Sequence, residues 1–366
     1  MNTDVRNSDE WRMLLGVLPP DLDEAAKRTG ALLRKREIAG GEDLLRLALV
    51  YGMDDMSLRE TSAWAKEHQI AKLSDVAVLK RLRLSPGFLR YVCSSLLEPV
   101  GLVGQGLRLV LVDATTVCRQ RAKEPDFRVH LSYSATQARI VGVQLTRSDE
   151  GERLDRLPSS QGDVLVADMG YQGRGSMSEV ASRGSYFVVR MYPTSIPLED
   201  ASGTRVDPFE LARDLGVGEV LDLPLRTIAS KGIPCVSGRL VVVRKPDKAV
   251  EEFLDRKRGK QGPVGAQARV AARYVMLFTN LPQELADAGR ALSVYKLRWQ
   301  VEMAFKRAKG VVSLGETLAR DMDLCECKIL AKLAILLLVQ KLGQDFSPWG
   351  YPLGTPQLIP SAKRRI

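Results

Sequence analysis

The chain has 366 residues, and its contents of 45% hydrophobic and 27% charged side chains are ordinary for a globular protein of two or three domains. Its formal net charge of +10 favours an anionic partner, with nucleic acid ahead of an acidic membrane. The most apolar run, Leu333–Val339, is too short to span a membrane and the N-terminus lacks the pattern of a signal peptide, so we expect a cytoplasmic protein.

Residues 1–100 are expected to form a helical domain. Leucine and alanine recur at helical spacing, and Ser57 with Glu60 is typical of a capping box at the start of a helix that ends near His68. Ser74 then begins a second, basic helix. Two short helices joined in this way predict a helix-turn-helix that binds DNA, although an all-helical packing domain with a solvated basic face explains the same pattern.

From residue 101 to 192 the pattern changes to apolar strands. Leu107–Val117 is a strand expected to end in the carboxylate of Asp113 and a turn, and Arg128–Arg147 predicts two strands around a short turn. Another strand ends at Asp168, and after a helix Tyr186–Tyr192 forms the next. Strands followed by helices predict a mixed α/β sheet covered on its faces.

Residues 193–280 read as a β-rich segment of alternating, antiparallel strands. The basic, glycine-containing stretch at residues 255–273 predicts a loop, either in contact with a phosphate backbone or merely solvated. A strand then returns to the core, residues 281–320 contain a charged helix, and residues 321–366 form a C-terminal helix and a basic tail.

The charged helix at Tyr295–Lys309 carries an unusual polar stripe. At about 100° per residue, Tyr295, Arg298, Glu302 and Lys309 point within roughly 60° of one another. An apolar stripe borders them and can face a core. The polar side chains either line a cleft or form a solvated face held by ion pairs.

Three acids stand out as candidates for shared chemistry. Asp113 and Asp168 each follow four apolar strand residues, so neighbouring strands would bring the two carboxylates together, with Glu302 arriving from the helix. Each aspartate alone is explained as well by a turn or a helix cap. Together they suit hard divalent cations such as Mg²⁺ and phosphodiester chemistry by two metals, which requires none of the chain's two histidines. The acids that do not follow an unbroken apolar strand rank lower: Asp126, Asp149, Glu150, Asp155 and Asp163.

At these residues the sequence resembles the transposases of bacterial insertion sequences that form the Insertion Sequence Four family. The polar stripe matches the YREK signature, Y-(2)-R-(3)-E-(6)-K. "DATT" at Asp113–Thr116 is similar to the first aspartate motif, with Ala114 in place of glycine, and "DMGY" at Asp168–Tyr171 is similar to the second, with Met169 in place of arginine. The resemblance covers residues 107–310.

The resemblance implies an RNase H-like catalytic core at residues 101–192 and 281–320, with residues 193–280 as the β-rich insertion that precedes the last catalytic helix. It implies a DDE triad of Asp113, Asp168 and Glu302 that binds two Mg²⁺ ions, with Mn²⁺ as a substitute. Tyr295, Arg298 and Lys309 would contact DNA near the cleaved end, and Trp299 either stacks on a base or packs in the core.

The resemblance further implies cut-and-paste transposition. Hydrolysis at the element end frees a 3′-hydroxyl, which in this family forms a hairpin on the opposite strand and later attacks target DNA. The partners are double-stranded DNA, as inverted-repeat ends and target, and a second copy of the chain at synapsis. The alternatives are a Mg²⁺-dependent nuclease without strand transfer, a DNA-binding copy without catalysis, and a basic protein that binds nucleic acid without sequence preference.

Overall fold

The computed structural model describes residues 9–53, 56–97 and 106–345. The expected domain boundary at residues 100–101 and the basic tail lie outside these residues. Within them, no helix is long and apolar enough to cross a membrane.

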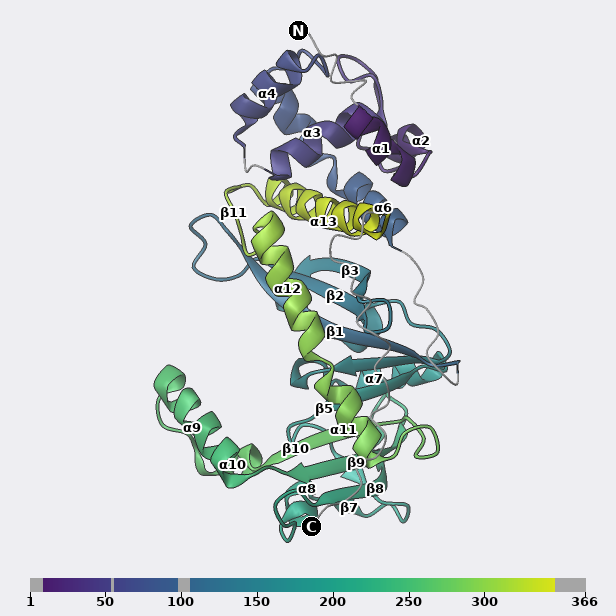
Figure 1. Cartoon of the computed structure of the whole chain (residues 1–366), viewed down its shortest axis with the longest axis vertical. Coiled ribbons are helices and arrows are strands. Elements are labelled where there is room, and N and C mark those ends of the chain that lie inside the picture. Colours follow the sequence, from purple (N-terminus) through teal and green to yellow (C-terminus); the bar gives the residue numbers. More distant parts are fainter. Residues whose placement is uncertain (1–8, 54–55, 98–105, 346–366) are drawn as a thin grey trace.

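The N-terminal region is helical, as expected, and forms one end of an elongated molecule (Figure 1). Both predicted caps are confirmed: Ser57 and Glu60 form a capping box, and Ser74 accepts a hydrogen bond from Ala77 N. The helices of this region are α1 (Asp9–Val17), α2 (Leu22–Arg28), α3 (Gly41–Met53), α4 (Leu58–Glu67), α5 (Asp75–Arg83) and α6 (Pro86–Leu96).

Helix α13 (Met322–Asp345) lies between these helices and the sheet (Figure 1). It packs against α3 and α6. Two ion pairs join the N-terminal helices to the beginning of α13: Arg83 to Asp321 at 2.5 Å and Arg90 to Glu326 at 2.8 Å. Arg83 belongs to the basic helix of the predicted helix-turn-helix. Part of that basic face therefore stabilises the fold.

A mixed sheet runs through the rest of the molecule in the order β3-β2-β1-β4-β5-β10-β9-β8-β6-β7. Strands β1, β4 and β5 are parallel neighbours, the other adjacent strands on this path are antiparallel, and β11 pairs with β1 in parallel. This is an RNase H-like arrangement with a β-rich insertion before the helices that contain Tyr295–Lys309. The strands are β1 (Arg108–Arg119), β2 (Phe127–Ser134), β3 (Arg139–Arg147), β4 (Asp163–Ala167), β5 (Tyr186–Arg190), β6 (Leu198–Glu199), β7 (Arg205–Val206), β8 (Val220–Thr227), β9 (Ser237–Arg244), β10 (Tyr274–Thr279) and β11 (Glu316–Thr317).

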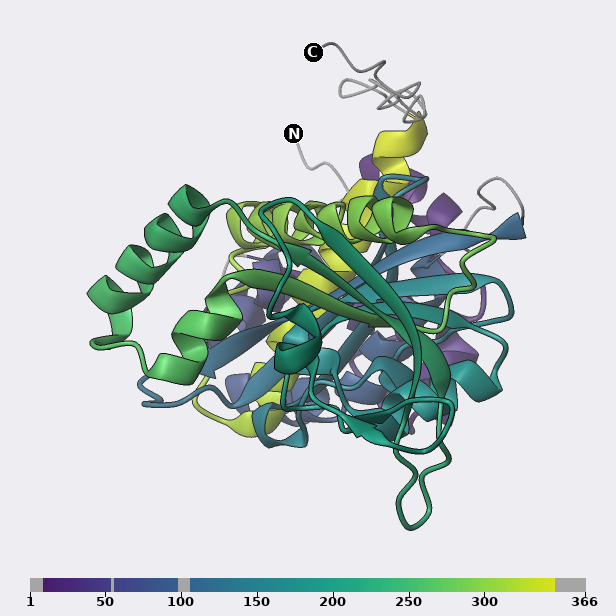
Figure 2. The ribbon, with the colours of Figure 1, turned by 90° about the horizontal axis from the view of Figure 1, so that it is seen from below.

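The helices of this part cover both faces of the sheet, and Figure 2 shows them from a second direction. Helices α11 and α12 pack on one face together with α13, and α7 and α8 lie on the other. The 3-10 helices are short: η3 (Ser148–Glu150), η4 (Leu154–Arg156) and η5 (Met169–Tyr171). The longer helices are α7 (Arg174–Ser182), α8 (Pro208–Ala212), α9 (Asp247–Gln261), α10 (Ala266–Ala272), α11 (Ala288–Lys296) and α12 (Trp299–Val312).

The expectation that the first strand ends at Asp113 is wrong. β1 continues to Arg119 because it stays paired with β2 as far as Val117↔Phe127, whereas its pairing with β4 stops at Leu111↔Val166. Asp113 therefore lies inside a strand, at a position where the β4 side of that strand is open.

The expected loop at residues 255–273 is also different. These residues belong to α9 and α10, which project from the sheet as a helical arm (Figure 1). The helix propensity of the charged residues outweighs the unfavourable effect of the single Gly259, and Arg258 pairs with Asp255 at 2.7 Å. The helix is interrupted at the turn around Gly262, whose φ is +79°.

Candidate active site

Asp113 and Asp168 emerge at the same edge of two neighbouring parallel strands. The last paired residues are Leu111 of β1 and Val166 of β4, and each aspartate lies two positions further along its strand direction. Asp113 shares the face of Leu111, because alternate residues of a strand point the same way, and that face is covered by α12. The register thus brings the two aspartates together, as expected.

The segment Tyr295–Lys309 is not one helix, which corrects the sequence-based expectation. α11 ends at Lys296 and α12 begins at Trp299, and the amides of Arg298 and Val301 bond three residues back, as in the tighter 3-10 turn. No glycine or proline marks this break. The two halves have different neighbours, since α11 packs against β4, β5, β8 and β9 and α12 against β1, β2 and α13.

Arg298, at this break, joins all three candidate acids. Its guanidinium lies 3.5 Å from Asp113 Oδ2 and 3.8 Å from Asp168 Oδ2, and it donates to Glu302 Oε1. Its side chain is only 16% exposed, so the positive charge is paired in a largely desolvated place. The cation that two neighbouring aspartates require is therefore supplied here by the chain itself.

The inner oxygen of each aspartate is already bonded. Asp113 Oδ1 accepts from Ala114 N at 2.9 Å, and Asp168 Oδ1 accepts from Met169 N at 2.7 Å and from the Tyr295 hydroxyl at 3.2 Å. The Oδ2 atoms consequently face Arg298. Burial raises the pKa of Tyr295, and Asp168 adds to this effect, so the phenol stays protonated and donates.

Burial also raises the pKa of Asp113, to about 6, against the lowering effects of Ala114 N–H and Arg298. Two further acids, Glu302 and Glu152, add to the rise through their negative charge. Glu152 could not be identified as a site residue from the sequence. It lies in the loop after β3, 3.8 Å from Arg128, and its carboxylate touches the backbone of Gly170.

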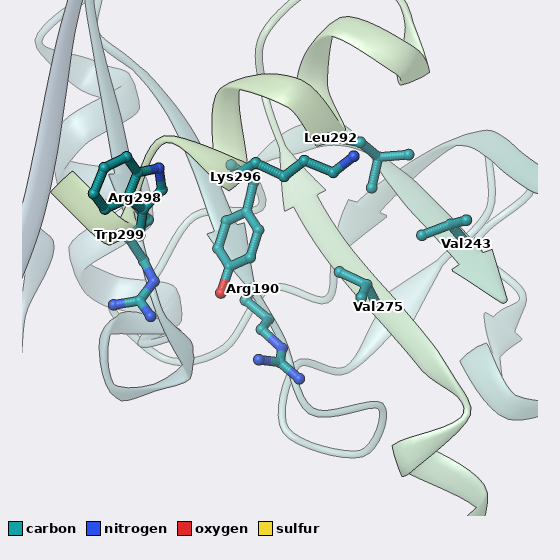
Figure 3. A pocket seen from close by; sticks show the side chains of 8 residues that line it. Arg190, Val243, Val275, Leu292, Lys296, Arg298 and Trp299 are labelled. Atoms are coloured by element: carbon teal, nitrogen blue, oxygen red, sulfur yellow. The ribbon is translucent and has the colours of Figure 1, made fainter. Parts of the chain in front are cut away.

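The remaining signature residues have separate positions. Lys309 is exposed on α12, seven residues and about 10 Å along the helix from Glu302. Trp299 is 56% exposed, which excludes the core role considered for it. It lines a cleft of about 330 Å³ beside the acids, together with Arg190, Lys296, Arg298 and several apolar residues (Figure 3).

The acids ranked lower have structural partners in four of five cases. These pairs are Asp126 with Arg119, Glu150 with Arg156, Asp155 with Arg153, and Asp163 with Arg108. His130 is fully buried, and its two ring nitrogens are bonded to Tyr171 and Thr146 instead of to the three acids.

The donor set suits a hard divalent cation, because the carboxylates that converge here offer oxygen atoms alone. Over the described ranges, however, no three His, Cys, Asp or Glu side chains are grouped tightly enough to hold a metal as they stand. Arg298 accounts for this spacing, since its guanidinium lies among the three carboxylates.

Comparisons with known proteins agree with this geometry. Residues 104–338 match the model of a family described as the transposase DDE domain. The chain is 33% identical to the putative transposase InsL for insertion sequence element IS186A of Escherichia coli (strain K12), over 93% of this chain and 96% of the relative. It is also 33% identical, over the same shares, to the transposase for insertion sequence element IS421 of Escherichia coli, and 21% identical to the transposase for insertion sequence element IS231F of Bacillus thuringiensis subsp. israelensis, over 88% and 77%.

Proposed function

Because the chain belongs to the transposase DDE domain family and is an insertion-sequence transposase, we propose that it moves its element by cut and paste within the Insertion Sequence Four family. The observation that carries this proposal is the convergence of Asp113, Asp168 and Glu302 on one guanidinium. The signature residues Tyr295 and Arg298 complete the same constellation. DNA is the substrate that a transposase requires.

Asp113, Asp168 and Glu302 are the residues that would hold two Mg²⁺ ions, or Mn²⁺ in their place. When bound, such ions activate an attacking oxygen and stabilise the leaving oxygen of a phosphodiester. The chain contributes rigid placement: one acid is held inside β1, one directly follows β4, and the third stands in the first turn of α12. This placement lets water and a 3′-hydroxyl use one site in succession, first for cutting and then for strand transfer.

The cations around the acids provide the contacts with DNA. Arg298 and Lys309 bind phosphates near the cleaved end, and the Tyr295 hydroxyl, already aimed at Asp168, orients the terminal phosphate. Trp299 is exposed beside them and can stack on an unpaired base, as a hairpin step would require.

We also propose a role for each region of the chain. We assign DNA binding to residues 1–100, catalysis to residues 101–192 and 281–320, and support of the DNA-facing helix to the insertion at 193–280. Two element ends must be held together, so we infer a homodimer on DNA, acting at the nucleoid of a bacterial cytoplasm.

A strand-transfer assay tests the proposal. Purified protein is incubated with Mg²⁺ and duplex DNA carrying the element's own flanking ends and a target plasmid, and joined products are counted for the wild type, Glu302→Gln and a matched control, Glu251→Gln, on the exposed arm. Joined products that persist in the control and vanish in Glu302→Gln support the proposal. Cutting without joining indicates a nuclease, and cutting undiminished in Glu302→Gln shows that the triad is wrong.

A further inference from the structure

Arg298 is the group at the candidate active site that a divalent cation has to replace. The Oδ1 atoms of Asp113 and Asp168 are occupied by backbone amides, so the Oδ2 atoms remain for a cation, and both of these face Arg298. The guanidinium also binds Glu302 Oε1. Arg298 thus takes an oxygen of every acid to which we assign metal binding.

We propose that Arg298 is a built-in counter-ion that competes with the metal, and that DNA relieves this competition by offering the guanidinium a phosphate. The inference rests on the proposed function, because it takes the three acids as the metal site. Without DNA, Arg298 offsets one of the three carboxylate charges and lies beside an oxygen of each acid, so the site binds metal weakly. With DNA, the arginine exchanges carboxylates for phosphate, with which it pairs equally well.

The surroundings of Arg298 permit this exchange. Its side chain also lines the cleft with Trp299 and Lys296, so the guanidinium has open space next to its present partners (Figure 3). It projects from the turn between α11 and α12, outside the regular hydrogen bonding of either helix. A long side chain at such a turn can change partners without unfolding a helix.

Coupling follows from the exchange. If DNA strengthens metal binding, metal must strengthen binding of the same DNA state by the same factor. The enzyme would then assemble its metals only when a phosphodiester lies in the site, which protects other DNA from unwanted cutting. This coupling is a property of Arg298 and not of the overall positive charge.

The test measures Mn²⁺ binding without DNA, from the electron paramagnetic resonance signal of free Mn²⁺. The variants are Arg298→Ala, Arg298→Lys, which keeps the charge, and the matched control Arg307→Ala, which removes an exposed cation from the same helix. We expect Arg298→Ala to bind Mn²⁺ roughly tenfold more tightly than the wild type, within the usual range of coupling between sites. Arg298→Lys should lie between them, and Arg307→Ala should match the wild type.

A second titration adds a short duplex with an element end. Bound DNA also offers phosphate oxygens to the metal, so Mn²⁺ affinity should rise in both proteins. The rise should be several-fold larger in the wild type than in Arg298→Ala, because only the wild type also releases a guanidinium from the acids. Unchanged or weaker Mn²⁺ binding by Arg298→Ala without DNA overturns the inference, and Arg298→Lys provides the same comparison if the alanine variant does not fold. Glu302→Gln separates the two proposals. Mn²⁺ affinity that is unchanged in Glu302→Gln contradicts the proposed metal site itself. Mn²⁺ affinity that falls in Glu302→Gln but is unchanged in Arg298→Ala contradicts only the role of Arg298 as a competing counter-ion.

Discussion

At the scale of single residues, the carboxylate of Glu152 shows how closely the site is packed. A Cβ atom on Gly170 would lie 1.6 Å from Glu152 Oε2, so the glycine is the residue that leaves room for this acid two positions after Asp168. Burial raises the pKa of Glu152, and Asp168 raises it further. Both effects disfavour the charged form of Glu152, so a cation bound beside it would be stabilised by its ionised carboxylate and would lower this pKa again.

Gly170→Ala should push Glu152 away without altering a charge. Because the backbone of Gly170 lies outside the left-handed region, the cost falls on the flexible Glu152 side chain and the fold should survive. For Gly170→Ala we expect half-maximal cleavage to require a several-fold higher Mg²⁺ concentration than in the wild type. Glu152→Ala should raise this concentration by the same factor, and the double variant should raise it no further. Gly175→Ala, whose Cβ would only meet Ile233 at ordinary contact distance, is the control, and additive effects in the double variant would contradict the contact.

His130 gives a second prediction, on acid stability. Burial lowers its pKa to about 4, helped by the nearby charges of Arg156 and Arg128, whereas an unfolded histidine titrates near 6.5. Between these values the unfolded chain binds more protons, so the stability due to neutral His130 is complete above about 6.5 and is lost towards pH 4.

The raised pKa of Asp113 acts in the opposite direction below pH 6, so the comparison must be made against a His130 variant. We expect His130→Gln to be less stable than the wild type at pH 7.5, and the gap between them to narrow at pH 5. Urea unfolding of both proteins at pH 7.5 and at pH 5 measures this difference in the free energy of unfolding. A difference that does not depend on pH would contradict a buried neutral histidine.

At the scale of elements, local signals placed most of the fold correctly. Ser57 and Ser74 predicted their helices because a cap acts within one turn. The pattern of Val220–Thr227 and Ser237–Arg244 predicted paired strands, although the middle of Ser237–Arg244 is buried on both faces of the sheet. The convergence of Asp113 and Asp168 could be predicted for the same reason, since each follows an apolar run.

Features that depend on distant partners could not be predicted. β1 extends beyond Asp113 because β2 pairs with it, and the helix breaks near Arg298 because its halves pack on different strands. Glu152 reaches the site from a loop with no periodic pattern. In each case the deciding contact lies ten or more residues away in sequence, beyond the reach of a local pattern.

Lys309 lies exposed on α12, about two helical turns beyond Glu302, which yields a prediction for that helix. Lys309→Ala should weaken binding to an element end and reduce the salt slope by about one counter-ion, as loss of one phosphate contact does. Arg307→Ala, on another side of α12, is the control. Binding is measured by fluorescence anisotropy over a range of salt, and equal effects of the two changes would argue for a diffuse charge effect instead.

At the scale of the whole molecule, one hydrophobic core joins the N-terminal helices to the sheet through α13. Buried residues of α3, α6 and α13 belong to the same cluster as those of α12 and β1. The ion pairs of Arg83 and Arg90 cross the same boundary. The N-terminal helices and the sheet are therefore expected to unfold together, in spite of their different secondary structure.

Gly52→Ala tests this coupling at the contact between α3 and α13. A Cβ at Gly52 would lie 2.6 Å from Ala331 Cβ and 3.3 Å from Lys328 O, so the two helices must separate. Overpacking of this kind costs about 1–3 kcal/mol, against a gain of about 1 kcal/mol from the better helix propensity of alanine. We expect a net loss of stability, whereas Gly16→Ala in α1, which has open space around it, should be neutral or stabilising.

Urea unfolding of Gly52→Ala, followed by far-UV circular dichroism and by tryptophan fluorescence, provides the measurement. Trp11 and Trp64 report on the N-terminal helices, and Trp299 reports on the site at the other side of α13. A single, coincident transition shifted to lower urea follows if α13 binds both regions into one cooperative unit. Two separate transitions would mean that the N-terminal helices unfold independently of the sheet, and that α13 is stabilised by only one of these two regions.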